Sequence, residues 1–408
     1  MDISQPLALL GGLSPQTFMK RHWQKKPLLI RQAVPQFNTP GFKLPVDAKA
    51  LFALAASDDV ESRLVMGGEV ASQTATKSSA KKRNKPQNAA ANAWQLKSGP
   101  FERRALPPFK KPNWSLLVQG VDLHVNAIRD LMDQFRFVPD ARLDDVMISY
   151  ASAGGGVGPH FDSYDVFLLQ AHGRRQWQIS QQKDLTLLPG MPLKILANFE
   201  PEQTFVLEPG DMLYLPPRYA HDGIALGECM TYSIGFRAPN RGELARELLQ
   251  RLGDDAQDEV GAALYRDGKQ PAITSPAQIP AELTAFALSA VQAALKDPVV
   301  LQRALGEFLT ELKPDVWFDL TFETGVPGGS DAMEYAESLA LDRRTKMMFD
   351  ERHVFINGES FLAQGRDAAL MRRLANERRL AGAELRRASS GARGLLQDWI
   401  EAGWIHEC

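Results

Sequence analysis

Apolar and polar residues alternate with a period of two over Arg175–Ile179, as they do in a strand with one buried face. Four more short apolar runs lie nearby, at residues 146–150, 165–170, 212–215 and 231–236. Gly- and Pro-rich turns separate them, for example Glu208-Pro-Gly-Asp211. Short strands divided by such turns predict a jelly-roll (double-stranded β-helix) barrel between Val146 and Arg237.

The pattern changes to helical spacing after Asn240. Apolar residues at helical intervals predict one helix around Leu244–Leu252 and another around Leu283–Leu295. Near the C-terminus the sequence predicts strands at residues 347–349 and 353–356, and then helices around Leu370/Leu374 and Leu395/Trp399. Helices combined with a small hairpin in so short a segment are typical of a winged-helix-like domain.

These patterns predict a mixed α and β chain with three domains: residues 1–239, 240–313 and 314–408. The first holds a helical N-terminal part and the barrel, the second is helical, and the third is winged-helix-like. Residues 71–93 contain Ala, Ser, Asn, Gln and Lys and no aromatic residue, so we expect a disordered basic insertion there. A solvated insertion is favoured over a segment that touches RNA.

Composition narrows the functional class. The chain has 408 residues and a net charge of −2, so no global field favours nucleic acid or membranes. Its two cysteines form no disulfide framework or cysteine-rich zinc site, which favours a reducing compartment. The N-terminus has no basic leader, and no run of eighteen apolar residues occurs. We therefore expect a cytoplasmic protein without a membrane span.

Candidate metal ligands lie in the predicted barrel. His160 and Asp162 are two residues apart, so on a strand both would face one metal ion. Of the other histidines, His221 follows a strand and a turn within the same β region. Two histidines and one carboxylate form the facial triad that binds Fe(II) and leaves adjacent positions open. The competing interpretation is that these histidines are hydrogen-bonded within the fold without a metal.

A facial-triad iron needs a reductant, which in the commonest class is 2-oxoglutarate. Arginine suits the far carboxylate of this co-substrate, because its planar guanidinium binds a carboxylate through two hydrogen bonds. The alternation puts Arg175 on the apolar face with Trp177 and Ile179, so Arg175 should point inward and Arg174 outward. The alternative is that both arginines are surface charges.

At these motifs the sequence resembles the JmjC-type bacterial ribosomal oxygenases, a group that includes ribosomal-protein arginine hydroxylases. The resemblance covers most of the chain. It is carried by Gly154-Gly-Gly-Val-Gly-Pro-His-Phe-Asp-Ser-Tyr-Asp-Val-Phe167, Gly173-Arg-Arg-Gln-Trp177, Glu208-Pro-Gly-Asp-Met-Leu-Tyr-Leu-Pro-Pro217, Tyr232-Ser-Ile-Gly-Phe-Arg-Ala-Pro239, Arg21-His-Trp-Gln-Lys-Lys-Pro27 and Asn113-Trp-Ser-Leu-Leu-Val-Gln119.

The resemblance implies a JmjC/cupin barrel, a helical dimerisation region and a winged-helix domain. It implies β-hydroxylation of an arginine in a large-subunit ribosomal protein, with Fe(II), 2-oxoglutarate and O2. Carried over by position, the metal ligands are His160, Asp162 and His221, and Arg175 binds 2-oxoglutarate. Ser149 and Thr231, on strands that flank the site, are candidates to assist the co-substrate.

The substrate contacts are less constrained. Tyr164 and Asp165 follow the H-x-D motif and could receive a cationic arginine by ring stacking and charge pairing. The opposing interpretation is that Asp165 faces solvent and Tyr164 packs in the barrel wall. Both can serve only if the chain bends after Ser163, because on a continuous strand they lie on opposite faces.

Three alternative functions remain open on the residues alone: a JmjC-type demethylase, a histidyl hydroxylase, and a non-enzymatic cupin sensor joined to a winged-helix module. Between Arg366 and Arg393 lie eight arginines and three acidic residues, which could form a phosphate-binding face. A solvated helix surface is the simpler explanation, so direct nucleic-acid binding stays open.

Overall fold

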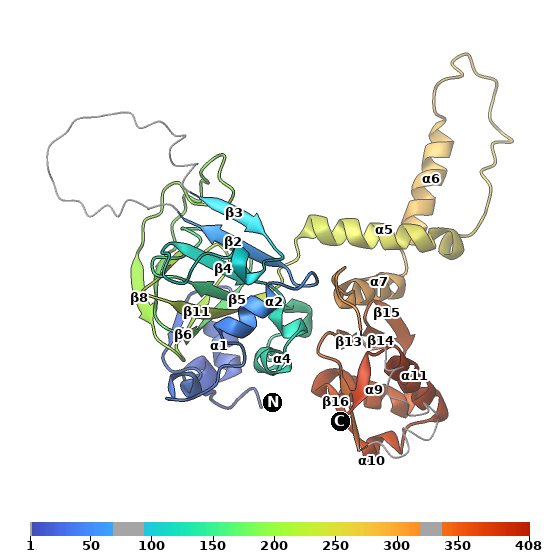
Figure 1. Ribbon diagram of the computed structural model, residues 1–408. Helices are drawn as coiled ribbons and strands as arrows, with labels where there is room; N and C mark the ends of the chain where they lie inside the picture. Colours follow the sequence, from blue (N-terminus) through green and yellow to red (C-terminus); the bar gives the residue numbers. More distant parts are fainter. Residues whose placement is uncertain (1, 68–93, 319–336) are drawn as a thin grey trace. The chain divides into compact units, whose positions relative to one another are not determined.

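The structure, a computed structural model, describes residues 2–67, 94–318 and 337–408. The predicted basic insertion at 71–93 lies outside these residues. The chain divides into two compact units, Met1–Ala238 and Pro239–Cys408 (Figure 1). This division falls next to the predicted limit at residue 239, while the three-domain scheme stays a prediction.

The first unit contains two antiparallel sheets. The larger has the order β1-β9-β6-β11-β5-β4-β2-β3, and the smaller has the order β10-β7-β8. The strands of the larger sheet, in the same order, are Leu28–Ile30, Met212–Leu215, Val166–His172, Cys229–Phe236, Leu143–Ala151, Trp114–Val118, Ser62–Met66 and Gln95–Ser98. Those of the smaller sheet are Ala220–Ala225, Arg175–Ser180 and Gln203–Leu207.

Strand β6 shows how the larger sheet is buried on both faces. Phe167 and Leu169 belong to a core shared with the N-terminal helices, whereas Val166 and Leu168 pack in a second cluster with residues of the smaller sheet. Alternate side chains of a strand point to opposite faces, so a continuous apolar run such as β6 requires cover on both sides. The second cluster forms the interior of the jelly roll, where the candidate site lies.

Helices α1 (Pro15–Arg21), α2 (Ala48–Leu54) and α4 (Asn126–Asp133) belong to the first unit. The hydroxyl of Ser14 accepts from the Thr17 N–H at the start of α1, and the Asp47 carboxylate accepts from the Ala50 N–H at α2. These N-caps satisfy backbone donors that the helix itself leaves free. Phe18 of α1 is fully buried against the aromatic ring of Tyr214 on β9, which joins the helical part to the sheet.

The second unit begins with α5 (Arg241–Val260), α6 (Ala281–Ala294) and α7 (Pro298–Thr310). Among its described residues the unit also has α9 (Gly365–Glu377), α10 (Gly382–Leu385) and α11 (Ser390–Glu401). Two small sheets complete it, with strands β13 (Met347–Phe349), β14 (His353–Ile356), β15 (Glu359–Leu362), β12 (Ser338–Leu341), β16 (Arg379–Ala381) and β17 (Ile405–Glu407). The predicted strands at 347–349 and 353–356 are therefore confirmed.

One local prediction is wrong. His160 and Asp162 do not lie on a regular strand, because His160 forms only an isolated bridge with His221 and Asp162 lies in a loop. The helical reading of the N-terminal part also missed β1 and β2. Strand β10 was missed because Asp222 and Gly223 interrupt its apolar pattern.

In the part of the chain that the structure covers, no single helix is long and apolar enough to cross a bilayer. Within residues 2–67, 94–318 and 337–408, one bent pair, α6 with α7, has the length and composition of a span when the two are taken together.

Candidate active site

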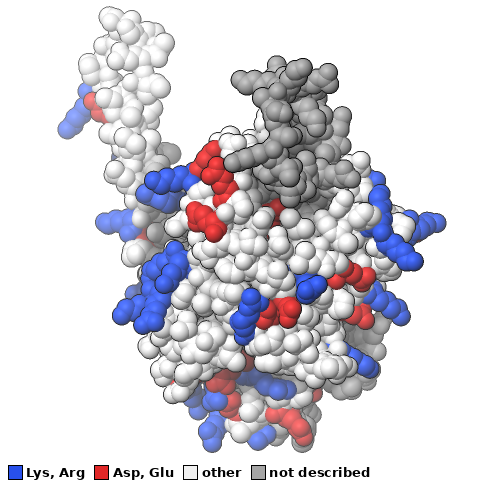
Figure 2. Space-filling view, turned by 90° about the vertical axis from the view of Figure 1, so that its left-hand side faces the viewer, with Lys and Arg blue, Asp and Glu red and all other residues white. Residues whose placement is uncertain are grey.

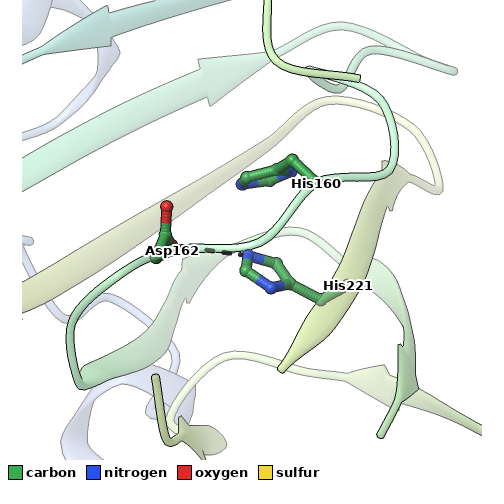
Figure 3. A group of neighbouring side chains, drawn as sticks. All are labelled: His160, Asp162 and His221. Atoms are coloured by element: carbon green, nitrogen blue, oxygen red, sulfur yellow. Dashed lines mark ion pairs between the residues drawn. The ribbon is translucent and has the colours of Figure 1, made fainter. Parts of the chain in front are cut away.

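The three predicted metal ligands converge in the first unit (Figure 3). The backbones of His160 and His221 exchange two hydrogen bonds, with N–O distances of 2.9 and 2.8 Å. The imidazole centroids are 4.2 Å apart, and the ligand atoms of His160, Asp162 and His221 lie within 4.8 Å of one another. In the figure both rings and the carboxylate point toward one common space.

Backbone carbonyls set the orientation of both imidazole rings. The Nδ1 of His160 lies 2.8 Å from the Gly158 oxygen, and the Nδ1 of His221 lies 2.9 Å from the Tyr219 oxygen. A carbonyl oxygen only accepts, so each Nδ1 must carry the proton and donate it. The Nε2 atoms then carry the free lone pairs, which is the arrangement found in metal-binding histidines.

The electrostatics of the site favour a neutral His221 ring. Burial, and then the neighbouring His160, lower the pKa of His221 to about 4, although Asp162 acts in the opposite direction. A neutral ring is the form that binds a metal ion. The 3.7 Å separation between the His221 Nε2 and the Asp162 Oδ2, drawn as a dashed line in Figure 3, is therefore a spacing between two candidate ligands rather than an ion pair.

A cavity of about 340 Å³ opens beside these residues, within the size range of small-molecule sites. Arg175 and Trp177 of β7, Ser149 of β5 and Leu168 of β6 line it together with the three candidate ligands. The cavity therefore lies between the two sheets, with the candidate ligands in its wall.

Arg175 is the clearest candidate to bind an anionic ligand. Its side chain is buried, and its Nη1 donates weakly to the Ser149 Oγ at 3.4 Å. Its Nε and Nη2 are buried and have no hydrogen-bond partner. A buried guanidinium with free donors is costly unless an anion meets it. Arg174 is exposed, so the strand phase matches the prediction that Arg175 points inward.

The two hydroxyl residues proposed to assist the co-substrate have different surroundings. Ser149 and Thr231 are cross-strand partners. Ser149 lines the cavity and contacts Arg175, whereas the Thr231 hydroxyl donates to the Gln170 side chain at 3.0 Å and Thr231 does not line the cavity. The geometry thus favours Ser149 and does not support a co-substrate contact for Thr231.

The structure contradicts the substrate role of Asp165. This residue is fully buried, and its carboxylate accepts from the Tyr214 hydroxyl at 2.6 Å, from the Gln24 amide and from the Arg142 guanidinium. Its two oxygens thus link β9, the N-terminal segment and the residue that precedes β5. Asp165 therefore supports the barrel, whereas Tyr164 is 40% exposed and lines the cavity.

Sequence reasoning missed two acidic residues. Asp144 and Asp145, at the start of β5, line the same cavity as Tyr164. Burial, and then the charges of Asp162, Asp145 and Asp144, raise the pKa of Tyr164. The signal was present in the Asp-Asp pair directly before the predicted strand at Val146, on the strand that also carries Ser149.

Comparisons with known proteins agree with this geometry. The JmjC domain family matches residues 130–244, and the ROXA-like winged helix family matches residues 293–406. The ribosomal protein uL16 3-hydroxylase of Escherichia coli K12 is 35% identical over 304 residues, which cover 73% of this chain and 72% of that protein. The chain belongs to the JmjC-domain ribosomal oxygenases.

Other relatives extend the likeness. A probable ribosomal oxygenase of Haemophilus influenzae is 33% identical over 235 residues, which cover 57% of this chain and 52% of that protein. The crystal structure of E. coli YcfD has a TM-score of 0.77 at 30% identity and covers 96% of this chain and 97% of its own. YcfD in complex with cobalt and 2-oxoglutarate has a TM-score of 0.74 at 29% identity, covering 97% and 98%.

These likenesses confirm two parts of the predicted fold of this ribosomal oxygenase. The JmjC match falls on the jelly roll that the strand pattern predicted. The winged-helix match includes the strands β13 and β14 and the helices that follow them. The C-terminal region is therefore a winged-helix domain.

The buried network of Asp165 gives a test of its structural role. Asp165→Ala should lower the free energy of unfolding by about 3–5 kcal/mol, because it leaves Arg142 and the Tyr214 hydroxyl without their carboxylate. Urea unfolding followed by tryptophan fluorescence measures this change. Asp130→Ala, at an exposed position of α4, is the control and should change the stability by no more than about 0.5 kcal/mol. Unchanged stability of Asp165→Ala would return Asp165 to the substrate site.

Proposed function

We propose that this ribosomal oxygenase is an Fe(II)- and 2-oxoglutarate-dependent hydroxylase that acts on an arginine of a large-subunit ribosomal protein. One observation carries the proposal: a two-histidine, one-carboxylate cluster lines the same cavity as a buried arginine with two unpartnered donors. The E. coli relative named a uL16 3-hydroxylase supports the substrate class, and the E. coli YcfD complex with cobalt and 2-oxoglutarate supports the ligands.

His160, Asp162 and His221 would hold the iron. The donor set fits, because both Nε2 atoms are free and the third donor is a carboxylate. Bound iron, with 2-oxoglutarate and O2, would supply the oxidising power that hydroxylates an unactivated carbon. The task of the protein is then to hold the ligands, exclude water and place the target carbon.

Arg175 would bind the far carboxylate of 2-oxoglutarate through its free Nε and Nη2 donors. The Trp177 ring lies 5.7 Å from its guanidinium carbon, and the Ser149 hydroxyl accepts from Nη1, so the guanidinium is held from two sides. Apolar residues such as Leu168 surround it in the cavity. These apolar surroundings exclude water and so strengthen the pairing between Arg175 and the carboxylate, which favours one fixed orientation of the co-substrate.

The cavity lining supports a cationic substrate side chain. Tyr164, Asp144 and Asp145 line it together, so a ring face and negative charge surround a guanidinium there, although Asp145 also accepts from the Gly120 N–H. A neutral histidine would gain less from these carboxylates, so the arginine substrate is favoured over the histidyl-hydroxylase alternative. A methyl-lysine is also cationic, and only the named hydroxylase relative weighs against demethylation.

The winged-helix domain gives less support for nucleic-acid binding. Arg373 pairs with Glu377 and Glu384, and Arg372 and Arg378 donate to backbone carbonyls. Part of the arginine-rich segment is therefore used within the domain. The first unit gives no more support, because charges of both signs are interspersed on its face that Figure 2 shows. A ribosomal-protein substrate also supports a cytoplasmic location.

We further propose that the protein forms a homodimer through α6. Five large apolar side chains are exposed on this helix and on the residue that directly follows it: Leu283, Phe286, Leu288, Val291 and Leu295. A helix with so much exposed apolar surface needs a partner, and twofold dimers are the commonest solution. A second copy of the chain brings the same surface.

The metal assignment is tested by substitution of its ligands. His160→Ala and His221→Ala should each abolish Fe(II)-dependent conversion of 2-oxoglutarate to succinate, because each removes one of three donors. Succinate formation in the presence and absence of added Fe(II) measures this. His172→Ala, an exposed histidine at the end of β6, should retain activity. Normal succinate formation by either ligand variant would remove the triad assignment.

The two neighbouring arginines provide a matched pair. Arg175→Ala should raise the KM for 2-oxoglutarate by a factor that corresponds to about 2–5 kcal/mol, because a buried carboxylate would lose its partner. Arg174→Ala removes an exposed charge and should leave KM nearly unchanged. Steady-state kinetics with 2-oxoglutarate as the varied substrate separates them. Equal effects of the two substitutions would contradict the role of Arg175.

The dimer is tested on the exposed face of α6. Leu288→Glu combined with Val291→Glu should convert the protein to a monomer, because both side chains are more than half exposed and carboxylates oppose an apolar contact. Sedimentation velocity at micromolar concentration measures the mass. Leu264→Glu, at an exposed position outside α6, is the control and should remain dimeric. A monomeric unsubstituted protein would contradict the proposal.

A further inference from the structure

The carboxylate ligand Asp162 lies in a loop, so the sheets do not fix it directly. Its backbone oxygen accepts a hydrogen bond of 2.7 Å from the N–H of Arg218. Arg218 belongs to the turn that joins β9 to β10, three residues before His221. A single turn is therefore bonded to one candidate ligand and leads directly into another.

This turn has an unusual residue at its third position. The Tyr219 N–H donates to the Pro216 oxygen at 3.3 Å, which defines a four-residue turn. Pro217 occupies the second position, and Arg218 occupies the third with a φ of +64°. Proline followed by a residue with positive φ is the pattern of a type II turn. Glycine or asparagine is strongly preferred at the third position of such a turn. An arginine held there indicates that the surrounding structure imposes the conformation.

The turn type decides where the Arg218 N–H points. Type I and type II turns differ by a flip of their central peptide group, and here that group consists of the Pro217 carbonyl and the Arg218 N–H. Only the type II form, which needs a positive φ at Arg218, directs this N–H to the Asp162 oxygen. The next residue, Tyr219, supplies the oxygen that accepts from the His221 Nδ1.

We propose that Arg218 is a positioning residue, whose left-handed backbone fixes Asp162 for metal binding while the same turn orients His221. The proposal rests on the proposed function, because it requires a metal ion at the triad. The guanidinium of Arg218 lies 5.8 Å from the Phe161 ring, at an exposed position, and contributes little. The backbone conformation, not the charge, does the positioning.

Three substitutions separate backbone from side chain. Arg218→Ala removes the guanidinium and keeps a Cβ like that of arginine, so metal affinity should change by no more than a few-fold. Arg218→Gly relieves the left-handed strain and should bind metal at least as tightly as Arg218→Ala. Arg218→Val, which is β-branched and resists positive φ, should favour the flipped peptide and weaken metal binding about 10–100-fold, as loss of an outer-shell contact does.

The measurement is an anaerobic titration of the full-length protein with Co(II), followed by the visible absorption of the bound ion. His221→Ala gives the background, and thermal unfolding without metal shows whether each variant is folded. Arg378→Val is the matched control, because Arg378 is also an arginine with positive φ but ends α9 in the second unit. It should lower stability and leave Co(II) affinity unchanged.

Each outcome has a defined meaning. A Co(II) affinity of Arg218→Val equal to that of the unsubstituted protein would overturn the proposal. A larger loss of Co(II) affinity in Arg218→Gly than in Arg218→Ala would also overturn it. The glycine and alanine comparison stands even if the valine variant fails to fold. Failure of the unsubstituted protein to bind Co(II) above the His221→Ala background would instead contradict the proposed function.

Discussion

The site depends on the pair of backbone hydrogen bonds between His160 and His221. These bonds join a loop that follows a glycine-rich segment to the first residues of β10. These bonds hold together two residues that lie 61 positions apart, and their ring centroids are 4.2 Å from each other. Backbone bonds that form on folding fix this distance before any ligand arrives, so the protein bears the ordering cost in advance.

The remaining features follow from that contact. Carbonyl groups at Gly158 and Tyr219 turn the rings so that both Nε2 atoms face the same space. The cross-strand pairing of β10 with β7 then brings Arg175 and Trp177 into the cavity beside the rings. Arg175 is a charged residue in the cavity wall whose Nε and Nη2 donors are buried without a hydrogen-bond partner, a cost that a bound anion would offset. Buried polar groups in a protein core are normally hydrogen-bonded, whereas a ligand-binding site keeps donors for its ligand.

Sequence patterns predicted the barrel and the cluster of His160, Asp162 and His221, because each shows a recognisable pattern over a few neighbouring residues. Alternation around Arg175 fixed its phase, and the H-x-D motif with His221 identified three residues that the fold does bring together. Asp165 was misjudged for a physical reason. Its partners Tyr214, Gln24 and Arg142 come from three distant segments, and no spacing near Asp165 reveals them. The prediction of a strand at His160 was also wrong, because a single β-bridge to His221, and not a regular strand ladder, sets the position of His160.

The most direct test of the central claim is mass spectrometry of large-subunit ribosomal proteins from cells with and without this gene. The account predicts that one arginine-containing peptide gains the mass of a single oxygen atom only when the gene is present. Fragmentation should locate the oxygen on the arginine side chain, and a His160→Ala copy of the gene should not restore it. Identical peptide masses in all strains, or an oxygen located on a histidine, would contradict the proposed arginine hydroxylation.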